Sequence, residues 1–360
     1  DKEYASLPEQ HRFVIPDGCH WQEVRERTEN LGAAIVGAMR QIEIANPDTL
    51  YGVLSMFSSQ KWTNKAILND SKIRDLIEHL SKRKLGNKDY PADLMGDAYE
   101  ILLKKFADDS KAQAGEFYTP RSVVRLLVHI LDPQPGETVY DPACGSGGML
   151  IEAIRYMHDD SLCCGSIFGQ EKNVVNAAIA KMNLFLHGAS DFNVMQGDTL
   201  RDPKILQGGN IAKFDCVIAN PPFSLENWGA TEWSSDKYKR NIYGTPSDSC
   251  GDYAWIQHMI CSMSSGKGRM AVVMPQGILF RGNQEAEIRK QLVESDLIEA
   301  VVTLGDKLFY GTGLSPCFLI IRRMKQAHHS GRILMIDGSK ILTQKRAQNI
   351  LEENDIDRLY

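Results

Sequence analysis

Several common signatures are missing from this sequence of 360 residues, and each absence disfavours a class of protein. Its eight cysteines form no C-x-x-C pair, which disfavours a metal site or a disulfide framework and favours reduced thiols in a cytoplasmic protein. No apolar run approaches the roughly 20 residues that a membrane-spanning helix needs, so no membrane contact is expected. With a formal net charge of -5, the chain lacks the overall basic character of a nucleic-acid binder. This charge does not exclude a local basic groove that binds nucleic acid.

The glycine-rich stretch in the middle of the chain also lacks both common nucleotide fingerprints. It reads D-x-x-x-G-x-G from Asp141 to Gly147, not G-x-G-x-x-G, and no lysine follows the glycines. A P-loop and a pyrophosphate site are therefore disfavoured. What is present is a short β-rich run, Thr138–Tyr140, followed by an acid, a glycine turn and a helical run. Such a turn lets the backbone approach a ligand in nucleotide-type sites of open α/β sheets; a purely structural turn is the alternative.

Helical periodicity dominates the first third of the chain. It recurs over residues 21–40, 70–85 and 91–106, whereas strand signals are scarce before Thr138. We therefore expect a helical N-terminal domain over residues 1–113. Its helices suit a substrate cap, a partner-binding bundle or simple packing, and the pattern does not choose among them.

From about residue 114, strand and helix patterns alternate. Alternation of this kind predicts an α/β domain over residues 114–340, with a doubly wound, mostly parallel sheet whose ligands bind at the carboxyl ends of the strands. A last strand over 332–336 precedes residues 341–360, which we expect to begin a helical C-terminal tail that continues in the natural chain. The other predicted strands are Thr138–Tyr140, Ser166–Gly169, Phe192–Met195, Cys216–Ala219, Met270–Met274, Ile298–Thr303 and Cys317–Ile321.

Acidic residues follow three successive predicted strands. Asp141 closes the first, Glu171 follows the second 30 residues later, and Asp198 follows the third after another 27. One βαβ unit beyond a glycine loop, a carboxylate is placed to bind both hydroxyls of a ribose, and one at the third strand can accept a hydrogen bond from an adenine amino group. A single acid at such a place would more simply be a solvated loop residue. Three in succession behind a glycine loop favour a ligand site.

The fourth predicted strand ends in Asn220-Pro-Pro-Phe223, the sharpest signal in the chain. Pro221 and Pro222 fix φ, so the carbonyl groups project from a stiff segment. Asn220 offers an amide oxygen and Phe223 a flat apolar face, which together suit a planar ring that bears an amino group. Hydrogen bonds to the two amino protons localise the nitrogen lone pair for attack, so the catalysis would be positional and electrostatic. A rigid turn with an Asn cap is the alternative.

The segment Gly115-Glu-Phe-Tyr-Thr-Pro-Arg121 precedes the first strand and leads into a helix. By local chemistry Thr119 caps that helix and Pro120 suits its first turn. Together with Asp141–Gly148 and Asn220–Phe223, however, this segment resembles the cofactor and catalytic motifs of amino-methylating DNA methyltransferases. The closest resemblance is to the modification subunit of type I restriction–modification systems, and it covers roughly residues 90–340.

The resemblance implies the seven-stranded sheet of S-adenosylmethionine-dependent methyltransferases. It also implies methyl transfer from S-adenosylmethionine to N6 of an adenine flipped out of DNA, since N6 cannot be reached in a stacked base. Asn220, Pro221, Pro222 and Phe223 would hold the adenine, and Phe309 would face it from the other side. Cofactor binding falls to Glu116, Phe117, Tyr118, Thr119, Pro120, Arg121, Asp141, Ala143, Gly145, Ser146, Gly147, Gly148, Glu171 and Asp198.

The resemblance assigns a different part of the cofactor to each of these segments. Residues 116–121 would line the methionine end of the cofactor, and Asp141 with the glycine turn would hold its amino-acid and ribose portion. Glu171 would bind the ribose hydroxyls and Asp198 the adenine.

The resemblance also names partners. In such systems two modification subunits clasp DNA together with one specificity subunit that reads the sequence, which accommodates a net-acidic catalytic chain. A restriction subunit with nuclease and translocase activity is a further partner of that kind. The polar loop 226–249 either folds over DNA or is a disordered surface loop. Two other functions stay open: methylation of an RNA base or a protein glutamine, and a non-catalytic scaffold subunit.

Overall fold

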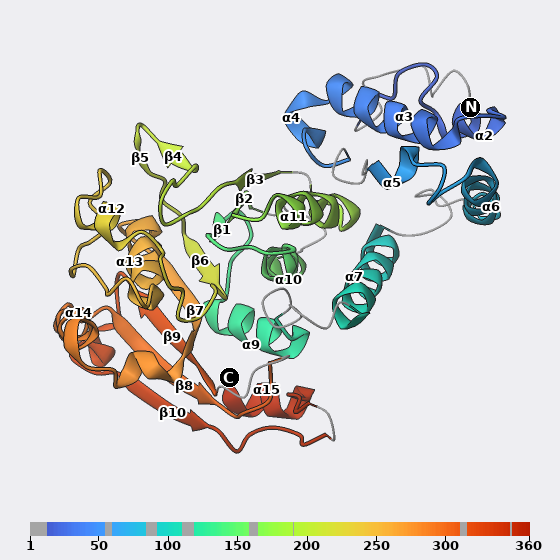
Figure 1. Ribbon diagram of the computed structural model, residues 1–360. Coiled ribbons are helices and arrows are strands. Elements are labelled where there is room, and N and C mark those ends of the chain that lie inside the picture. The colour runs from blue at the N-terminus through green and yellow to red at the C-terminus, as the bar shows by residue number, and fades with distance from the viewer. Residues whose placement is uncertain are drawn as a thin grey trace. The chain divides into compact units, whose positions relative to one another are not determined.

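The computed structural model is drawn in Figure 1. It describes residues 13–54, 60–83, 92–109, 119–157, 165–189, 191–309, 315–345 and 348–360. The chain divides into two compact units, residues 1–95 and 96–360. The division falls inside helix α7 (Ala92–Asp109) because the helix packs against the larger unit from Gly96 onward. The division between residues 95 and 96 therefore lies before the expected boundary at 113. The expected domain limits remain predictions.

All regular elements described in the first unit are helices. A small core of Leu31, Ile73 and Ile77 holds them together. One helix was expected over residues 21–40, which is wrong: the chain breaks at Asn30, whose φ is 53°, and Asp70 accepts hydrogen bonds from the N–H groups of Asn30 and Leu31. The helices that lie wholly in this unit are α2 (Trp21–Glu26), α3 (Leu31–Ala45), α4 (Pro47–Leu50), α5 (Gln60–Thr63) and α6 (Asp70–Leu80).

The second unit contains a sheet with the strand order β10-β8-β9-β7-β6-β1-β2-β3. Strand β9 runs antiparallel to β7 and β8, and the other pairs are parallel. The predicted doubly wound, mostly parallel sheet is confirmed. Its strands are β1 (Val139–Asp141), β2 (Ile167–Glu171), β3 (Phe192–Gln196), β6 (Cys216–Ala219), β7 (Arg269–Pro275), β8 (Ile298–Leu304), β9 (Pro316–Arg322) and β10 (Leu334–Gly338).

In the described part of the chain the sheet has eight strands, one more than the seven that the resemblance implies. The eighth is β10, the last strand that the sequence predicted over 332–336, and it pairs with β8 over its whole length, from Leu334 opposite Ala300 to Gly338 opposite Leu304. A separate hairpin of β4 (Leu206–Gln207) and β5 (Asn210–Ile211) was not predicted. Its signal was present, since a Gly-Gly pair between the strands supplies the positive φ angles that a tight hairpin turn needs.

Helices cover both faces of the sheet, and alternate residues of each strand enter two separate hydrophobic clusters. On β6, Cys216 and Ile218 belong to one cluster, Val217 and Ala219 to the other. This alternation is what a strand buried on both faces produces. The first cluster is covered by α9 (Arg121–Leu131), α10 (Gly148–Met157), α11 (Val174–Leu186) and α15 (Glu353–Leu359), the second by α12 (Ala230–Ser234), α13 (Asp252–Ser262), η3 (Gln276–Leu279) and α14 (Asn283–Glu294).

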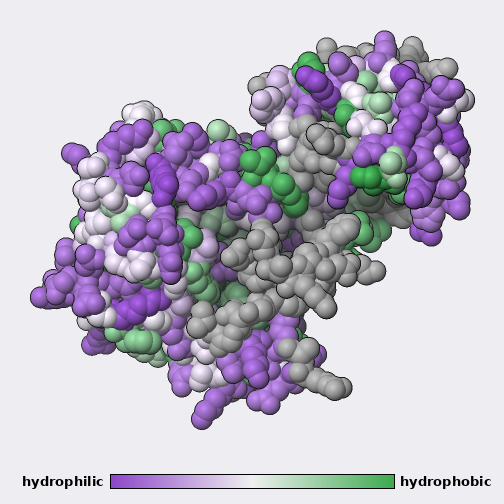
Figure 2. All heavy atoms as spheres, viewed as in Figure 1, coloured by the Kyte–Doolittle hydropathy of each residue, from purple (hydrophilic) through white to green (hydrophobic). Residues whose placement is uncertain are grey.

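The segment after the sheet is part of this packing. Ile356 and Leu359 of α15 lie in the first cluster, and the helix contacts α9. Most of the coloured atoms on the face seen in Figure 2 belong to hydrophilic residues. Among the described residues no helix is both long and apolar enough to cross a membrane.

Candidate active site

The glycine loop leaves β1 at the carboxyl edge of the sheet. Asp141, the last residue of β1, is only 2% exposed, and its Oδ1 accepts a hydrogen bond from the N–H of Ala143 at 2.9 Å. The loop then turns through Gly145 and Gly147, whose φ angles are 52° and 84°, before α10 begins at Gly148. Burial, followed by the charge of Glu171, raises the pKa of Asp141 to about 8. The free site therefore keeps this carboxyl largely protonated at neutral pH.

Glu171 lies beside this loop, as the sequence predicted. Its Oε2 accepts from the N–H of Gly145 at 2.9 Å, and its Oε1 accepts from the N–H of Asn173 at 2.7 Å. Burial raises the pKa of this carboxyl as well. Each oxygen keeps a second lone pair, so the carboxylate braces the glycine loop and can still accept from the hydroxyls of a ligand.

Asp198 follows β3 and closes the row of acids. Its Oδ1 accepts from the N–H groups of Leu200 and Arg201, both at 3.2 Å, and its Oδ2 lies 2.9 Å from Nζ of Lys172. The next residue, Thr199, donates its hydroxyl to the carbonyl of Pro142 at 2.6 Å. The loops after β1 and β3 are therefore joined directly, although 57 residues separate the two partners.

Asn220 follows the last residue of β6 and reaches across to the segment before α9. Its Nδ2 donates to Oγ1 of Thr119 at 2.8 Å. Its Oδ1 is buried and has no hydrogen-bond partner among the described residues. A buried acceptor without a donor costs about 1–3 kcal/mol, so it is normally retained only for a reason. The free acceptor points to a ligand that brings an N–H group.

The residues beside Asn220 differ in exposure. Pro221 is buried, Pro222 is exposed and Phe223 is half-buried. Phe309 is only 5% exposed, and its ring centroid lies 6.4 Å from that of Phe223 with the two planes tilted by 57°. The two rings thus contact each other directly, and a planar base would have to separate them. Stacking of Phe309 on a substrate base remains a prediction.

The turn after Phe223 is held by residues that the sequence did not reveal. Ser224 has a φ of 50° and donates its N–H to Oδ1 of Asp252 at 2.7 Å. Asp252, which is 1% exposed, also binds Arg281 through Oδ2 at 2.8 Å, and Arg281 reaches Glu285 at 3.1 Å. Asp252 is readable from the sequence only as an acid in the first turn of a helix, and nothing in its spacing connects it to Asn220.

The segment 115–121 is only partly described. Glu116, Phe117 and Tyr118 lie outside the described residues. Thr119 does not cap α9 as local chemistry predicted: the N-cap is Pro120, without a side-chain capping bond, and Thr119 accepts from Asn220 instead. Thr119 and Arg121 line an open pocket, whose empty volume is about 450 Å³ including the solvent at its mouth, together with Glu100, Val124, Ser146, Gly148, Glu152, Arg155 and Asn183.

The loop 226–249 is anchored by buried side chains rather than being a disordered surface loop. Trp228 and Trp233 are each 2% exposed, and Arg240 is 1% exposed. The guanidinium of Arg240 lies 4.5 Å from the ring centroid of Trp233 and donates to the carbonyls of Thr199 and Leu200 at 2.8 Å each. Arg240 thus ties this loop to the residues that follow Asp198. Contact of the loop with DNA remains a prediction.

Comparison with known proteins gives one consistent result. The sequence profile of the family described as N-6 DNA Methylase matches residues 90–360. The chain is 34% identical over 355 residues to the MjaVII methylase subunit of a type I restriction enzyme from Methanocaldococcus jannaschii, covering 94% of this chain and 59% of that protein. It is 33% identical over 300 residues to the HindI methylase subunit, also of a type I restriction enzyme, from Haemophilus influenzae, covering 82% of this chain and 62% of that protein.

A solved structure agrees. The type I restriction-modification methyltransferase subunit from Streptococcus thermophilus superposes with a TM-score of 0.83 at 28% identity, covering 99% of this chain and 78% of that one. The chain spans less than two thirds of the length of the two curated relatives, 59% and 62%. Since the family profile matches well over half of the chain and includes the loops built around Asp141 and Asn220, the chain belongs to the N-6 DNA methylase family.

Proposed function

We propose that this chain transfers a methyl group from S-adenosylmethionine to the N6 amino group of an adenine flipped out of DNA. The observation that carries the proposal is the buried Oδ1 of Asn220, which has no donor among the described residues, at the carboxyl edge of the sheet. The exocyclic amine of adenine has two N–H donors on a planar ring. It therefore supplies what this acceptor lacks.

The chemistry asked of the protein is to position and polarise that amine. Oδ1 of Asn220 accepts one amino proton, and the carbonyl of Pro221, held by the rigid Pro-Pro backbone, accepts the other. Both bonds favour a tetrahedral nitrogen, whose lone pair is then free to attack. Thr119 fixes the amide of Asn220 from its other end at 2.8 Å, so the acceptor is preorganised. The face of Phe223 orients the ring. The bond between N6 and the methyl carbon would form as the methyl–sulfur bond breaks, leaving S-adenosylhomocysteine, and one amino proton would leave to water.

The residues around the glycine loop fit the proposed cofactor. Bound S-adenosylmethionine supplies an electrophilic methyl group on a positively charged sulfur. Three carboxyl groups, Asp141, Glu171 and Asp198, follow neighbouring parallel strands and suit a ligand with hydroxyl and amino donors. A positively charged ligand would also favour ionisation of Asp141. Glu171 keeps lone pairs for ribose hydroxyls, and Asp198 for an adenine amine. The rest of the proposed cofactor site is Glu116–Arg121, Ala143, Gly145, Ser146, Gly147 and Gly148.

The proposed setting is a type I modification assembly. The curated relatives are named methylase subunits of type I restriction enzymes. We infer that the whole protein acts with a specificity subunit that reads the DNA sequence, two modification subunits to one, and with a restriction subunit where cleavage occurs. A net charge of -5 fits a division of labour in which another subunit supplies most of the contact with DNA phosphates. The six cysteines that the structure describes are free thiols, and reduced cysteines are consistent with a protein of the cytoplasm.

The test is transfer of labelled methyl from S-adenosylmethionine to unmethylated DNA by the whole protein, with and without its specificity subunit. We expect labelled N6-methyladenine only with the partner present. An equal signal on RNA or on a glutamine-containing protein, with none on DNA, would move the substrate to that class. Cofactor binding without transfer to any of these substrates would instead indicate a scaffold subunit.

A further inference from the structure

The pocket beside the glycine loop contains charged residues that the sequence motifs do not explain. Thr119, Arg121, Ser146 and Gly148 come from the motif segments. Glu100 comes from α7, Glu152 and Arg155 from α10, and Asn183 from α11. All of them line the same 450 Å³ of empty volume. A pocket lined by both carboxylates and guanidinium groups suits a ligand that carries both charges, such as an α-amino acid.

One acid in this pocket is not matched by an arginine. Glu152 lies 3.7 Å from Nε of Arg125 and 3.9 Å from Nη1 of Arg155. Glu100 has no ion pair with a lysine or arginine within the described part of the chain; the basic group beside it there is His187, whose Nε2 lies 3.5 Å from Oε1. Despite the opposing effect of burial, its interactions with His187 and the nearby arginines lower the pKa of Glu100. Glu100 is thus an ionised carboxylate that can still take a cation.

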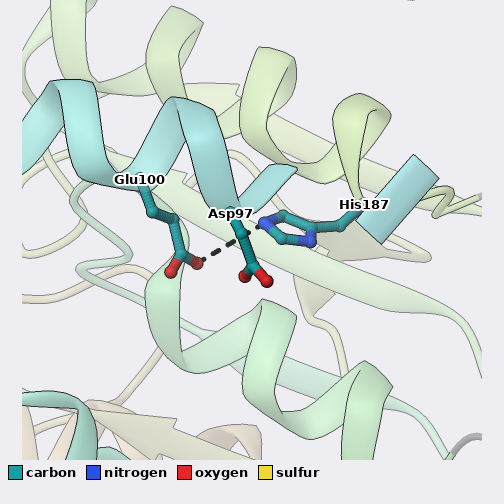
Figure 3. A group of neighbouring side chains, drawn as sticks. All are labelled: Asp97, Glu100 and His187. Atoms are coloured by element: carbon teal, nitrogen blue, oxygen red, sulfur yellow. Dashed lines mark ion pairs between the residues drawn. The ribbon is translucent and has the colours of Figure 1, made fainter. Parts of the chain in front are cut away.

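Asp97 and His187 lie beside this carboxylate, as Figure 3 shows. Asp97 and Glu100 project from α7 toward His187, which follows α11. Nη2 of Arg155 lies 2.6 Å from Oδ1 of Asp97 and 3.3 Å from Nδ1 of His187. Gly96 lets the helix come this close, because a Cβ there would lie 2.2 Å from the His187 ring. These contacts hold α7 against α10 and α11.

The same three residues have the spacing of a metal site, since one ligand atom from each of Asp97, Glu100 and His187 lies within 4.8 Å of the others. The hydrogen-bond pattern disfavours a metal. An arginine can only donate, so Nδ1 of His187 accepts from Arg155, and the proton of the neutral ring sits on Nε2. Nε2 then has no lone pair for a metal, and Arg155 already supplies the positive charge. The network is better explained as a support for Glu100.

We propose that Glu100 binds the α-ammonium group of the cofactor's amino-acid end, with His187 as its positioning residue. This rests on the proposed function, because it assumes S-adenosylmethionine. The pocket supports it by its position: it reaches Thr119, whose Oγ1 is bonded to Nδ2 of Asn220 at 2.8 Å. A ligand with its amino-acid end in the pocket therefore lies beside the residue that holds the methyl acceptor. Arg121, in the same lining, is the counterpart for the carboxylate.

The test compares three ligands in calorimetric titrations of the whole protein and its Glu100→Gln variant. S-adenosylhomocysteine has both the ammonium and the carboxylate, its decarboxylated analogue has only the ammonium, and methylthioadenosine has neither. We expect Glu100→Gln to weaken the first two by about 10-fold to 100-fold, the range for a hydrogen bond to a charged group, and to leave methylthioadenosine within about twofold. The matched control is Glu287→Gln, the same change on an exposed residue of α14, which should alter none of the three.

The other outcomes are distinguishable. An equal loss for methylthioadenosine would show general damage to the site and overturn the assignment, as would no loss for any ligand. Failure of the unaltered protein to bind any of the three would overturn the proposed function itself. If Glu100→Gln does not fold, Glu100→Asp keeps the charge and shortens the side chain, and we expect a smaller loss confined to the two ammonium ligands.

Discussion

The amide of Asn220 is tied to the hydroxyl of Thr119 by a hydrogen bond of 2.8 Å, although the two residues are 101 positions apart in the sequence. Asn220 belongs to the loop after β6, and Thr119 to the segment before α9. The bond uses one end of the amide and leaves the other, Oδ1, buried without a donor in the described chain. Two motifs that the sequence shows only as separate signals are therefore one site. The amide oxygen of Asn220 is thus held ready to accept a hydrogen bond from a substrate amine.

Replacing Asn220 with Ala is expected to reduce methyl transfer strongly while cofactor binding persists. Removing one preorganised group of this kind costs about 10²- to 10³-fold in rate, and loss of the buried unpaired oxygen removes a cost to folding rather than adding one. The measurements are single-turnover transfer of labelled methyl and titration with S-adenosylhomocysteine. Asn193→Ala, on an exposed position of β3, is the control that should change neither. Transfer by Asn220→Ala within threefold of the unaltered protein would exclude this acceptor from catalysis.

The parts of this site that the sequence predicted are those carried by strand ends. Asp141, Glu171 and Asp198 each follow a strand, and parallel strands bring such positions to one edge of the sheet. Periodicity locates strands well when they are buried on both faces. It failed at Asn30, where a left-handed residue divides an apparently continuous helical pattern.

The residues that the sequence did not reveal act from helices, or from segments next to helices, through tertiary contacts. Asp252 and Arg281 hold the turn after Phe223, and Glu100 and His187 meet only because α7 packs on α11. In the sequence Asp252 is an acid of a first helical turn, and the other three are polar residues in or beside helices. Their pairing depends on which helix faces lie together, and no spacing along the chain specifies that.

The buried carboxyl of Asp141 predicts a pH dependence. Its pKa is raised to about 8 in the folded chain, first by burial and then by Glu171, against about 3.9 for an unfolded Asp. Between these values the folded state binds more protons than the unfolded state. The contribution of Asp141 to the free energy of unfolding therefore falls as pH rises from about 4 to about 8, and is constant above that. Urea unfolding across this range should show the fall, and Asp141→Asn should remove it.

The same carboxyl should make cofactor affinity depend on pH in the opposite direction. A positively charged ligand binds the ionised carboxylate better, so affinity for S-adenosylmethionine should rise with pH up to about 8, by at most about tenfold per unit for one proton. Calorimetry in buffers of different ionisation enthalpy would detect the released proton. Asp141→Asn should bind with a flat profile. An unchanged profile in that variant would assign the proton to another group.

Asp252 is predicted to set the position of the catalytic turn. Asp252→Ala removes the acceptor of the Ser224 N–H and one partner of Arg281, and should lower the free energy of unfolding by about 3 kcal/mol, the lower end for a broken buried pair because Glu285 still contacts Arg281. Methyl transfer should fall further than cofactor affinity. Asp252→Asn keeps an oxygen for Ser224 and should retain more transfer. Equal transfer rates in the two variants would show that the Ser224 bond does not position the turn.

Arg240 is predicted to link the loop 226–249 to the adenine end of the proposed cofactor site. Its guanidinium binds Asp236 at 2.8 Å and the carbonyls of Thr199 and Leu200, the two residues after Asp198. Arg240→Met leaves Asp236 buried without this charge, so the free energy of unfolding should fall by about 3–5 kcal/mol. Arg240→Lys keeps a charge but not the planar fork and should recover only part of that loss.

The cofactor measurement separates this link from simple destabilisation. Because Thr199 and Leu200 lie beside Asp198, Arg240→Lys at a temperature where it is fully folded should weaken S-adenosylhomocysteine and methylthioadenosine by the same factor, since both carry the adenine. This differs from Glu100→Gln, which is expected to spare methylthioadenosine. The control for loss of one positive charge in the same loop is Lys239→Met, because Lys239 is next to Arg240 and exposed. If the folded Arg240→Lys variant binds both ligands as the unaltered protein does, Arg240 stabilises only the loop 226–249 and does not help to position Asp198.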